Sequence, residues 1–230
     1  MSVYALSDLH GNEILFNKIL NFLALNDKVY FLGDAADRGK AGFRLIKQIY
    51  EDPRFIYVKG NHEDMLIKAM EEFCSEHEKG EAFRLLAYNG GKNTFDEWRK
   101  FGTNMTWAKK LKNLPSWVAY INNKGQFISM SHAGFTPHQN EFPKKIDLIW
   151  SREHFLDDWD EQIKNTIIVH GHTPIIFLAE DLGLNLTELE PKPLWYCDNK
   201  KVCIDLGTYM TDAIMLLNLD TFKYHLFQEF

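Results

Sequence analysis

Acidic, histidine and asparagine side chains follow short apolar runs at five places in the chain. These are residue types that bind metal ions or transfer protons, and each group begins within a few residues of the end of its apolar run. The candidate ligands are Asp8, His10, Asp34, Asn61, His132 and His172, and Asp37, Arg38, His62 and Arg152 lie near them in the sequence.

Carboxylate, imidazole and amide ligands without cysteine suit divalent ions such as manganese, iron or zinc. Six or seven candidate ligands are too many for one tetrahedral zinc ion. They are enough for two ions that share a bridging carboxylate, an arrangement with a spacing of about 3.5–4 Å that is typical of phosphatases and nucleases. The pattern therefore predicts a centre for two metal ions.

The apolar runs are short, rich in β-branched or aromatic residues, and predicted to be buried strands at residues 3–6, 29–32, 55–58, 127–130 and 167–169. Apolar residues at helical spacing lie between the first three of these strands. One such segment follows the expected N-cap Asn12, and the other ends before Pro53. This alternation predicts a βαβ beginning and a parallel sheet. Because the carboxyl ends of parallel strands share one edge, the candidate ligands are expected to converge there.

The chain between about residues 64 and 117 is predicted to be a helical insert, interrupted at 89–91. Glu63 is expected at its start, where a carboxylate complements the helix dipole. We expect Trp98, Trp107 and Trp117 to be local core, with a rim that stacks an adenine or packs a peptide as the alternative. Strands return at 202–204, 213–219 and 222–227, so the expected class is mixed α/β with a late antiparallel part.

Composition restricts the function classes further. The 230 residues carry 26 Lys+Arg and 32 Asp+Glu, and the net charge of −6 argues against a dedicated nucleic-acid binder. We also expect no membrane span, because no apolar run approaches about 18 residues. The number of cysteines is odd, and none of them has CxxC spacing: they are Cys74, Cys197 and Cys203. This predicts reduced thiols in a cytoplasmic protein.

Five motifs, SDLHGN, GDAADRG, GNHE, SHAG and VHGHTP, occur in this order. Together they resemble the metallophosphoesterase (calcineurin-like) superfamily, and within it the phosphoprotein phosphatase family. YNGGKNT, LIWSRE and IDLGT extend the likeness toward the small bacterial and phage serine/threonine protein phosphatases. The resemblance implies one domain over residues 1–230, a four-layer α/β/β/α sandwich of two mixed sheets flanked by helices.

The same resemblance implies a role for each candidate residue. Asp8 and His10 would bind the first metal ion, and Asp34 would bridge both ions. Asn61, His132 and His172 would complete the second site. Arg38 and Arg152 would hold phosphate oxygens, which suits the planar guanidinium group. His62 would be the general acid for the leaving alkoxide, and Asp37 would orient it.

Two departures from the family pattern leave the ligands intact: Ser7 stands where eukaryotic members usually have Gly, and Ala36 replaces a common Val. The pair His170 and His172 is expected to face different sides, so that only one is a ligand. The match to the GHT segment of the family motif favours His172 as the ligand. His170 would then either support the ligands from beside them or be an ordinary packing residue.

The resemblance implies a metal-dependent phosphomonoester hydrolase, a serine/threonine protein phosphatase in which a hydroxide bridging two metal ions attacks phosphorus in line. The alternative is a symmetrical diadenosine tetraphosphatase, which releases ADP. A metal- or phosphate-sensing module without activity is disfavoured, since every expected position is filled. The expected metal is manganese, with iron or zinc as alternatives, and the expected partner is a phosphoprotein or a phosphorylated small molecule. The sequence does not indicate an oligomeric state.

Overall fold

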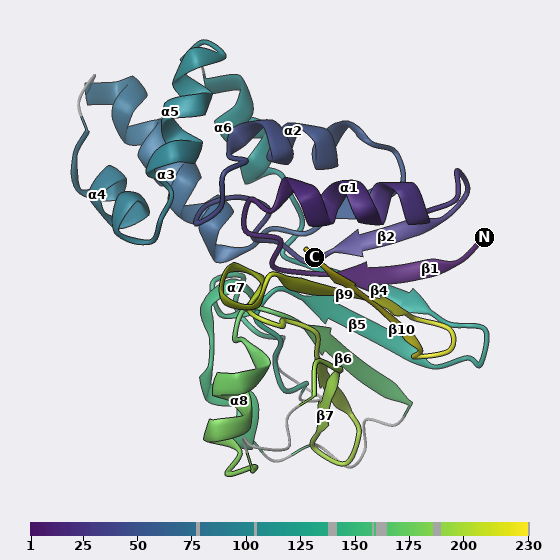
Figure 1. The fold of residues 1–230 in the computed structure, drawn as a ribbon. Helices are drawn as coiled ribbons and strands as arrows, with labels where there is room; N and C mark the ends of the chain where they lie inside the picture. The colour runs from purple at the N-terminus through teal and green to yellow at the C-terminus, as the bar shows by residue number, and fades with distance from the viewer. Residues whose placement is uncertain are drawn as a thin grey trace.

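The computed structural model describes residues 1–76, 79–103, 105–137, 142–157, 159, 165–185 and 190–229. Its strands form two mixed five-stranded sheets, which pack face to face in the middle of the molecule (Figure 1). Helices flank the pair of sheets, as the α/β/β/α prediction requires. The class and architecture expected from the sequence are therefore confirmed.

The first sheet has the order β10-β9-β1-β2-β3. Strands β1, β2 and β3 are parallel, while β9 pairs antiparallel with both β1 and β10. The predicted βαβ beginning and late antiparallel hairpin thus lie in the same sheet. Its strands are β1 (Val3–Leu6), β2 (Lys28–Phe31), β3 (Phe55–Tyr57), β9 (Ala213–Asn218) and β10 (Tyr224–Gln228).

The second sheet has the order β4-β5-β6-β8-β7, with parallel pairs in its centre and antiparallel pairs at both edges. The edge strands β4 and β7 were not predicted. Both are only half-buried, so they lack the continuous apolar signal of the central strands. The strands are β4 (Trp117–Ile121), β5 (Phe127–Ser131), β6 (Thr166–His170), β7 (Leu194–Tyr196) and β8 (Lys201–Cys203).

The helices over the first sheet are α1 (Glu13–Phe22), α2 (Phe43–Glu51), α3 (Asn61–Glu76), α4 (Glu81–Tyr88), α5 (Lys92–Lys100) and α6 (Met105–Lys112). The short helices α7 (Asp147–Trp150), η1 (Glu153–Leu156), α8 (Ile175–Asp181) and α9 (Thr208–Thr211) lie in the second half of the chain. The helical insert ends before residue 117, since Trp117 begins β4. The expected interruption at 89–91 separates α4 from α5.

Strand alternation divides the apolar core into layers. Tyr4 and Leu6 of β1 pack toward the helices, whereas Val3 and Ala5 pack against the second sheet. Trp98 is fully buried in the helical layer, as expected of a core residue. Within the described residues, no helix combines the length and apolarity that a bilayer span needs.

Candidate metal centre

The predicted ligands lie on loops that leave the carboxyl ends of five strands. Asp8 and His10 follow β1, Asp34 follows β2, and Asn61 follows β3 at the first turn of α3. His132 and His172 come from the second sheet, after β5 and β6. All six side chains are buried, so the two sheets bring them together at one shared edge (Figure 1).

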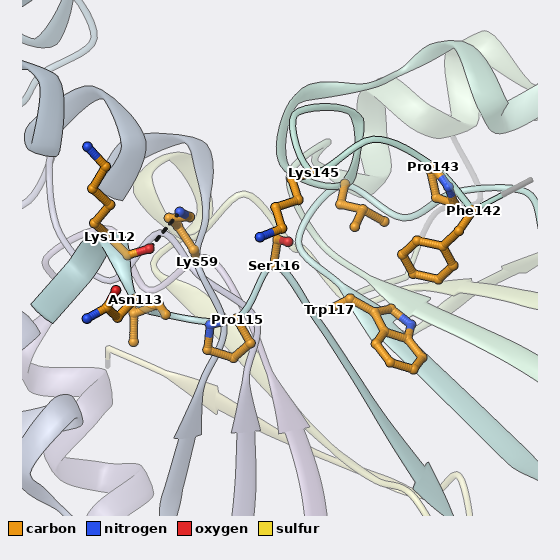
Figure 2. Close-up of a pocket in the computed structure, with 11 residues that line it drawn as sticks. Lys59, Lys112, Asn113, Pro115, Ser116, Trp117, Phe142, Pro143 and Lys145 are labelled. Atoms are coloured by element: carbon orange, nitrogen blue, oxygen red, sulfur yellow. Dashed lines mark hydrogen bonds between the residues drawn. The ribbon is translucent and has the colours of Figure 1, made fainter. Parts of the chain in front are cut away.

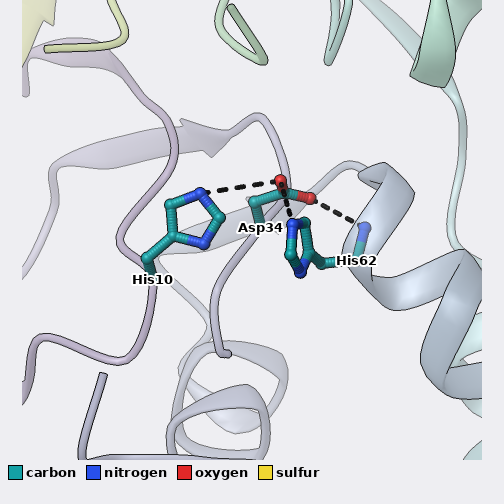
Figure 3. A group of neighbouring side chains, drawn as sticks. All are labelled: His10, Asp34 and His62. Carbon is teal, nitrogen blue, oxygen red and sulfur yellow. Dashed lines mark hydrogen bonds and ion pairs between the residues drawn. The ribbon is translucent and has the colours of Figure 1, made fainter. Parts of the chain in front are cut away.

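Asp34 belongs to two overlapping groups of potential ligand atoms. The first group is His10, Asp34 and His62, and the second is Asp8, Asp34 and His132. Within each group these atoms lie within 4.8 Å of one another. Asp34 Oδ2 is 3.8 Å from both His10 Nε2 and His62 Nε2, as Figure 3 shows, and its Oδ1 is 3.4 Å from His132 Nε2. The carboxylate thus faces both groups, as a bridging ligand must.

Asn61 extends the second group toward His172. Its Oδ1 lies 2.8 Å from His132 Nε2 and 3.0 Å from His172 Nδ1, and the two ring nitrogens are 3.2 Å apart. The backbone N–H of His172 donates to Asp8 Oδ2 at 3.0 Å. The second sheet's loop is therefore tied directly to a carboxylate from the first sheet.

The donor set fits divalent cations. Asp8 Oδ1 and His172 Nε2 are buried and have no hydrogen-bond partner among the described residues. Burial, reinforced by Asp34, raises the pKa of Asp8 to about 6. Burial and the charge of Asp8 also raise the pKa of Asp205 well above its usual range. Buried carboxylates this close to one another need a nearby cation, and oxygen and imidazole ligands without thiolate suit manganese, iron or zinc.

The histidines respond to the same carboxylates in opposite ways. Burial opposes the charge of His132, but Asp34 and Asp8 outweigh it and raise the pKa to about 10. The pKa of His172 falls well below its usual range, because burial is reinforced by the positive charges of His132 and Arg152. Bound cations would replace protons at this cluster, since a metal ligand must be deprotonated.

The loops hold several of these residues in the left-handed backbone region. Six of the ten predicted site residues have positive φ angles: Asp8 54°, His10 45°, Asp34 59°, Asp37 70°, Arg38 62° and His172 67°. Such conformations are uncommon outside glycine and persist only where the surrounding structure enforces them. Six such residues lie at this one edge, so the fold holds the backbone in unfavourable conformations there in order to position these side chains.

Glu63 is at the start of α3, as expected, but it has a second role that the sequence did not indicate. It lies in the first turn of α3 but is buried, and its two oxygens accept from Asp34 N (2.9 Å), Ala35 N (2.9 Å), Gly60 N (2.8 Å) and the Tyr57 hydroxyl (2.8 Å). A Cβ at Gly60 would collide with Asp34 Oδ1, so glycine is required where these loops meet. Glu63 is thus a positioning residue. The GNHE motif contained it, but its partners Asp34 and Ala35 lie almost 30 positions away in the sequence.

His62, a member of the first ligand group, is also paired with Asp37. His62 Nδ1 lies 2.7 Å from Asp37 Oδ2. Burial opposes protonation of His62, but Asp34 and Asp37 outweigh it and raise the pKa of the imidazole. Arg38 approaches from the other side, with Nη2 3.3 Å from His62 Nε2 and Nη1 3.3 Å from His10 Nε2. The His62 imidazole and the Arg38 guanidinium group therefore face the same space.

Tyr209 is a site residue that the sequence did not single out. Its ring lies under the Arg38 guanidinium, 4.1 Å from Cζ to the ring centroid, and edge-on to His10 at 5.5 Å. Tyr209 follows the IDLGT segment at the start of α9. It therefore joins a late segment of the chain to loops of the first sheet, which only the tertiary fold could reveal.

The second sheet supplies the remaining predicted residues. Arg152 is exposed at the rim, where its Nε donates to Thr173 Oγ1 at 3.1 Å, next to His172. His170 faces away from the ligands, and its Nε2 lies 2.8 Å from the Tyr196 hydroxyl. Two strand residues separated by one would share a face. The two histidines diverge because β6 ends at His170 and His172 lies in a turn.

The comparisons with known proteins agree with this geometry. A family model described as calcineurin-like phosphoesterase matches residues 1–204. The chain therefore belongs to the calcineurin-like phosphoesterase family, and it is a metallophosphoesterase-type hydrolase.

Relatives with different substrates in their names match the chain. It is 30% identical over 141 residues to the symmetrical bis(5'-nucleosyl)-tetraphosphatase of Buchnera aphidicola subsp. Schizaphis graminum, covering 60% of this chain and 46% of that protein. It is 25% identical over 163 residues to serine/threonine-protein phosphatase 2 of Salmonella typhimurium, covering 67% of this chain and 69% of that protein. The alignment thus spans less than half of the first relative and about two thirds of the second.

The solved structure of a metallophosphoesterase from Sphaerobacter thermophilus has the same fold. It superimposes with a TM-score of 0.57 at 13% identity, over 98% of this chain and 86% of that one. At this identity the likeness concerns the fold alone.

Proposed function

We propose that this protein is a metal-dependent phosphomonoester hydrolase that acts on phosphoserine and phosphothreonine in proteins. The observation that carries the proposal is the pairing of His62 with Asp37, 2.7 Å apart, beside the carboxylate shared by both ligand groups. A serine or threonine alkoxide is a poor leaving group and needs a proton as it departs. In this proposal His62 donates that proton, and Asp37 holds its ring in the orientation required.

In this proposal Asp8, His10 and Asp34 hold the first metal ion. Asp34, Asn61, His132 and His172 hold the second. We expect manganese, with iron or zinc as alternatives. Two such ions lower the pKa of water and offset negative charge on a phosphoryl group during in-line displacement. Asp34 belongs to both groups of neighbouring ligand atoms, which supports its proposed bridging role. His10 Nε2 lies 3.8 Å from Asp8 Oδ1, which supports placing these two residues at the same ion.

Arg38 and Arg152 are proposed to bind the phosphate oxygens. They contact different loops of the centre: Arg38 contacts His10 and His62, and Arg152 contacts the residue after His172. Two guanidinium groups would fix the phosphoryl group and reduce its negative charge. Their attachment to different sheets makes phosphate binding depend on how the sheets are packed.

We further propose that residues 1–230 form a single domain, in which α3–α6 are the helical insert. Side chains of this insert and of β1–β3 share one apolar cluster, which supports one folding unit. All three cysteines are free, consistent with the reducing cytoplasm that we propose as the location.

A symmetrical diadenosine tetraphosphatase is the second candidate, favoured by the relative from Buchnera aphidicola. That reaction breaks a phosphoanhydride bond and releases ADP, a better leaving group than an alkoxide. A competition assay separates the two. Metal-stripped protein is reloaded with Mn²⁺ and given a phosphoseryl peptide and diadenosine tetraphosphate at equal concentration, with products followed by chromatography. We expect orthophosphate and dephosphorylated peptide first, whereas early ADP with intact peptide would establish the alternative.

His62→Asn tests the general-acid role directly. We expect the variant to retain its metal ions but to lose about 10²–10⁴-fold in rate on alkyl phosphates. The loss on an aryl phosphate should be much smaller, because that leaving group departs without a proton. Equal losses on both substrates would contradict the assignment of His62.

A further inference from the structure

A groove lies beside the candidate metal centre, where the α6–β4 connection meets the segment before α7. It has a volume of about 480 Å³. Figure 2 shows Lys59, Lys112 and Pro115 on one side and Trp117, Phe142 and Pro143 on the other, with Lys145 between them. We call it the lysine groove and define it by Lys59, Lys112, Pro115, Trp117, Phe142 and Lys145.

The lysine groove adjoins the ligands Asn61 and His132. Lys59 precedes Asn61 by two residues, and Trp117 is paired in the sheet with Ser131, the residue before His132. Leu148, which also lines the groove, accepts a hydrogen bond from the backbone of Ala133 at 2.8 Å. A molecule bound at the centre could therefore continue directly into the groove.

Positive charge distinguishes this groove in an acidic protein. Three lysines line it, and no carboxylate does so among the described residues. Lys59 Nζ donates to the backbone oxygen of Lys112 at 3.4 Å, so the Lys59 side chain reaches the segment that carries Lys112 (Figure 2). Lys112 also pairs with Glu71 on α3 at 2.8 Å, outside the lining, whereas Lys145 is exposed. The groove therefore attracts anions although the whole chain has a net charge of −6.

Aromatic side chains form its other wall. Trp117 and Phe142 meet edge to face, with centroids 5.4 Å apart and an angle of 82° between the rings. Trp117 Nε1 donates to Ser129 Oγ at 2.5 Å, which fixes the indole. Phe142 is 62% exposed, so its ring is accessible to a bound molecule. This wall offers apolar contact to whatever the lysines attract.

The strand edges favour a polypeptide as the occupant. Among the described strands, β4 pairs only with β5, and β3 pairs only with β2. Both are edge strands, and β4 begins at Trp117 in the groove. Open strand edges bind extended peptides through backbone hydrogen bonds. Lysines beside such an edge select acidic side chains.

We propose that the lysine groove binds acidic residues that flank the phosphorylated serine or threonine of a protein substrate. This inference rests on the proposed function and names the substrates it would prefer. The lysines pair with glutamate or aspartate side chains, while Trp117 and Phe142 contact their apolar stems. An adenine stacked on the aromatic wall is the competing occupant, and the experiment distinguishes it.

The test compares two phosphothreonine peptides that differ only in having Glu or Gln at the positions around the phosphorylated residue. The test variant is Lys112→Gln with Lys145→Gln, and Lys59 is left intact because of its proximity to Asn61. The matched control is Lys124→Gln with Lys223→Gln, which removes the same charge from two exposed turns at the far ends of β4 and β9. Turnover of p-nitrophenyl phosphate, which has no residues flanking its phosphate, reports the basal activity.

We expect the test variant to raise KM for the Glu peptide by about fivefold to twentyfold, the size expected from losing two partly exposed ion pairs. KM for the Gln peptide and for p-nitrophenyl phosphate should stay within about twofold, and the control should match wild type. The charge-reversed variant, with Lys112→Glu and Lys145→Glu, should prefer the Gln peptide.

Two outcomes overturn the inference in different ways. Equal KM changes for both peptides, or none, would show that the groove does not recognise acidic residues while leaving the proposed function intact. A raised KM for diadenosine tetraphosphate with unchanged peptide values would assign the groove to a nucleotide. If wild-type protein cleaves diadenosine tetraphosphate but neither peptide, the proposed function fails and this inference fails with it.

Discussion

The two sheets hold their functional loops with different chemistry. Loops of the first sheet converge on the Glu63 carboxylate, which accepts three backbone N–H bonds and one hydroxyl bond. In the second sheet, an imidazole contacts the loop that carries a predicted ligand: His154 Nε2 lies 2.8 Å from the carbonyl oxygen of Ala133, the residue after His132. Burial and nearby Lys201 lower the pKa of His154 to about 4. One set of loops is held by a buried carboxylate and the other by a neutral ring.

This difference matches what each set of loops must do. The first sheet supplies seven of the ten predicted site residues, and five of those seven have positive φ angles. A charged acceptor makes stronger hydrogen bonds, which suits loops held in strained conformations. The second sheet supplies His132, His172 and Arg152, of which only His172 has positive φ. Weaker, neutral anchors suffice there.

The largest effect is expected from Asp34→Asn. Because Asp34 belongs to both ligand groups, we expect its loss to weaken both proposed metal sites, whereas His172→Ala should weaken one. We expect Asp34→Asn to lower kcat/KM by roughly a thousandfold or more, corresponding to several kcal/mol of transition-state stabilisation. Elemental analysis should find both ions depleted, compared with one in His172→Ala. Retention of two ions by Asp34→Asn would refute the bridging role.

Glu63→Gln should break the anchor of the first sheet. An amide group cannot accept all four hydrogen bonds, so we expect a loss of about 2–4 kcal/mol in unfolding free energy and about 10–100-fold in kcat. Urea unfolding and steady-state kinetics measure the two effects.

Glu72→Gln is the matched control, because Glu72 accepts backbone bonds from Gly80, Ala82 and Phe83 away from the centre. It should lose stability but keep its activity. Comparable loss of kcat in both variants would show that Glu63 has no special role at the site.

His154→Gln probes the neutral anchor of the second sheet. The pKa of His154 is 6.5 ordinarily and about 4 in the folded protein. At a pH between these two values, His154 binds a proton in the unfolded chain but not in the folded chain. Stability therefore falls as pH is lowered through this window, by about 3 kcal/mol from this residue. The variant should lose less stability than wild type between pH 7 and pH 4 in urea unfolding of metal-free protein. Parallel pH curves would mean that His154 is protonated in the folded state.

Tyr209→Leu should have the smallest effect. Removing the ring under Arg38 frees the guanidinium group, and a partly exposed cation–π contact is worth about 0.5–1 kcal/mol. We therefore expect KM for p-nitrophenyl phosphate to rise about twofold to fivefold with little change in kcat. Tyr209→Phe keeps the aromatic face and should behave like wild type. If the phenylalanine variant is equally impaired, the hydroxyl rather than the ring is responsible.

Much of the site was predictable because its residues follow buried strands within a few positions. Asp8, Asp34 and Asn61 follow apolar runs within three positions, and the tendency of parallel strands to end at one edge is enough to predict that these residues converge. The half-buried strands β4 and β7 escaped prediction because their pattern is not continuous. Trp117, which was expected in the helical insert, consequently lies at the start of β4 and lines a groove.

The sequence alone determined the fold class, the family likeness and the identities of the predicted ligands, because these depend on local periodicity and motif spacing. Only the tertiary structure decided that Glu63 joins two loops, that Tyr209 lies under Arg38, and that lysines from separate segments line one groove. Those contacts join residues far apart in the chain. Their geometry depends on how the two sheets pack, which no local pattern encodes.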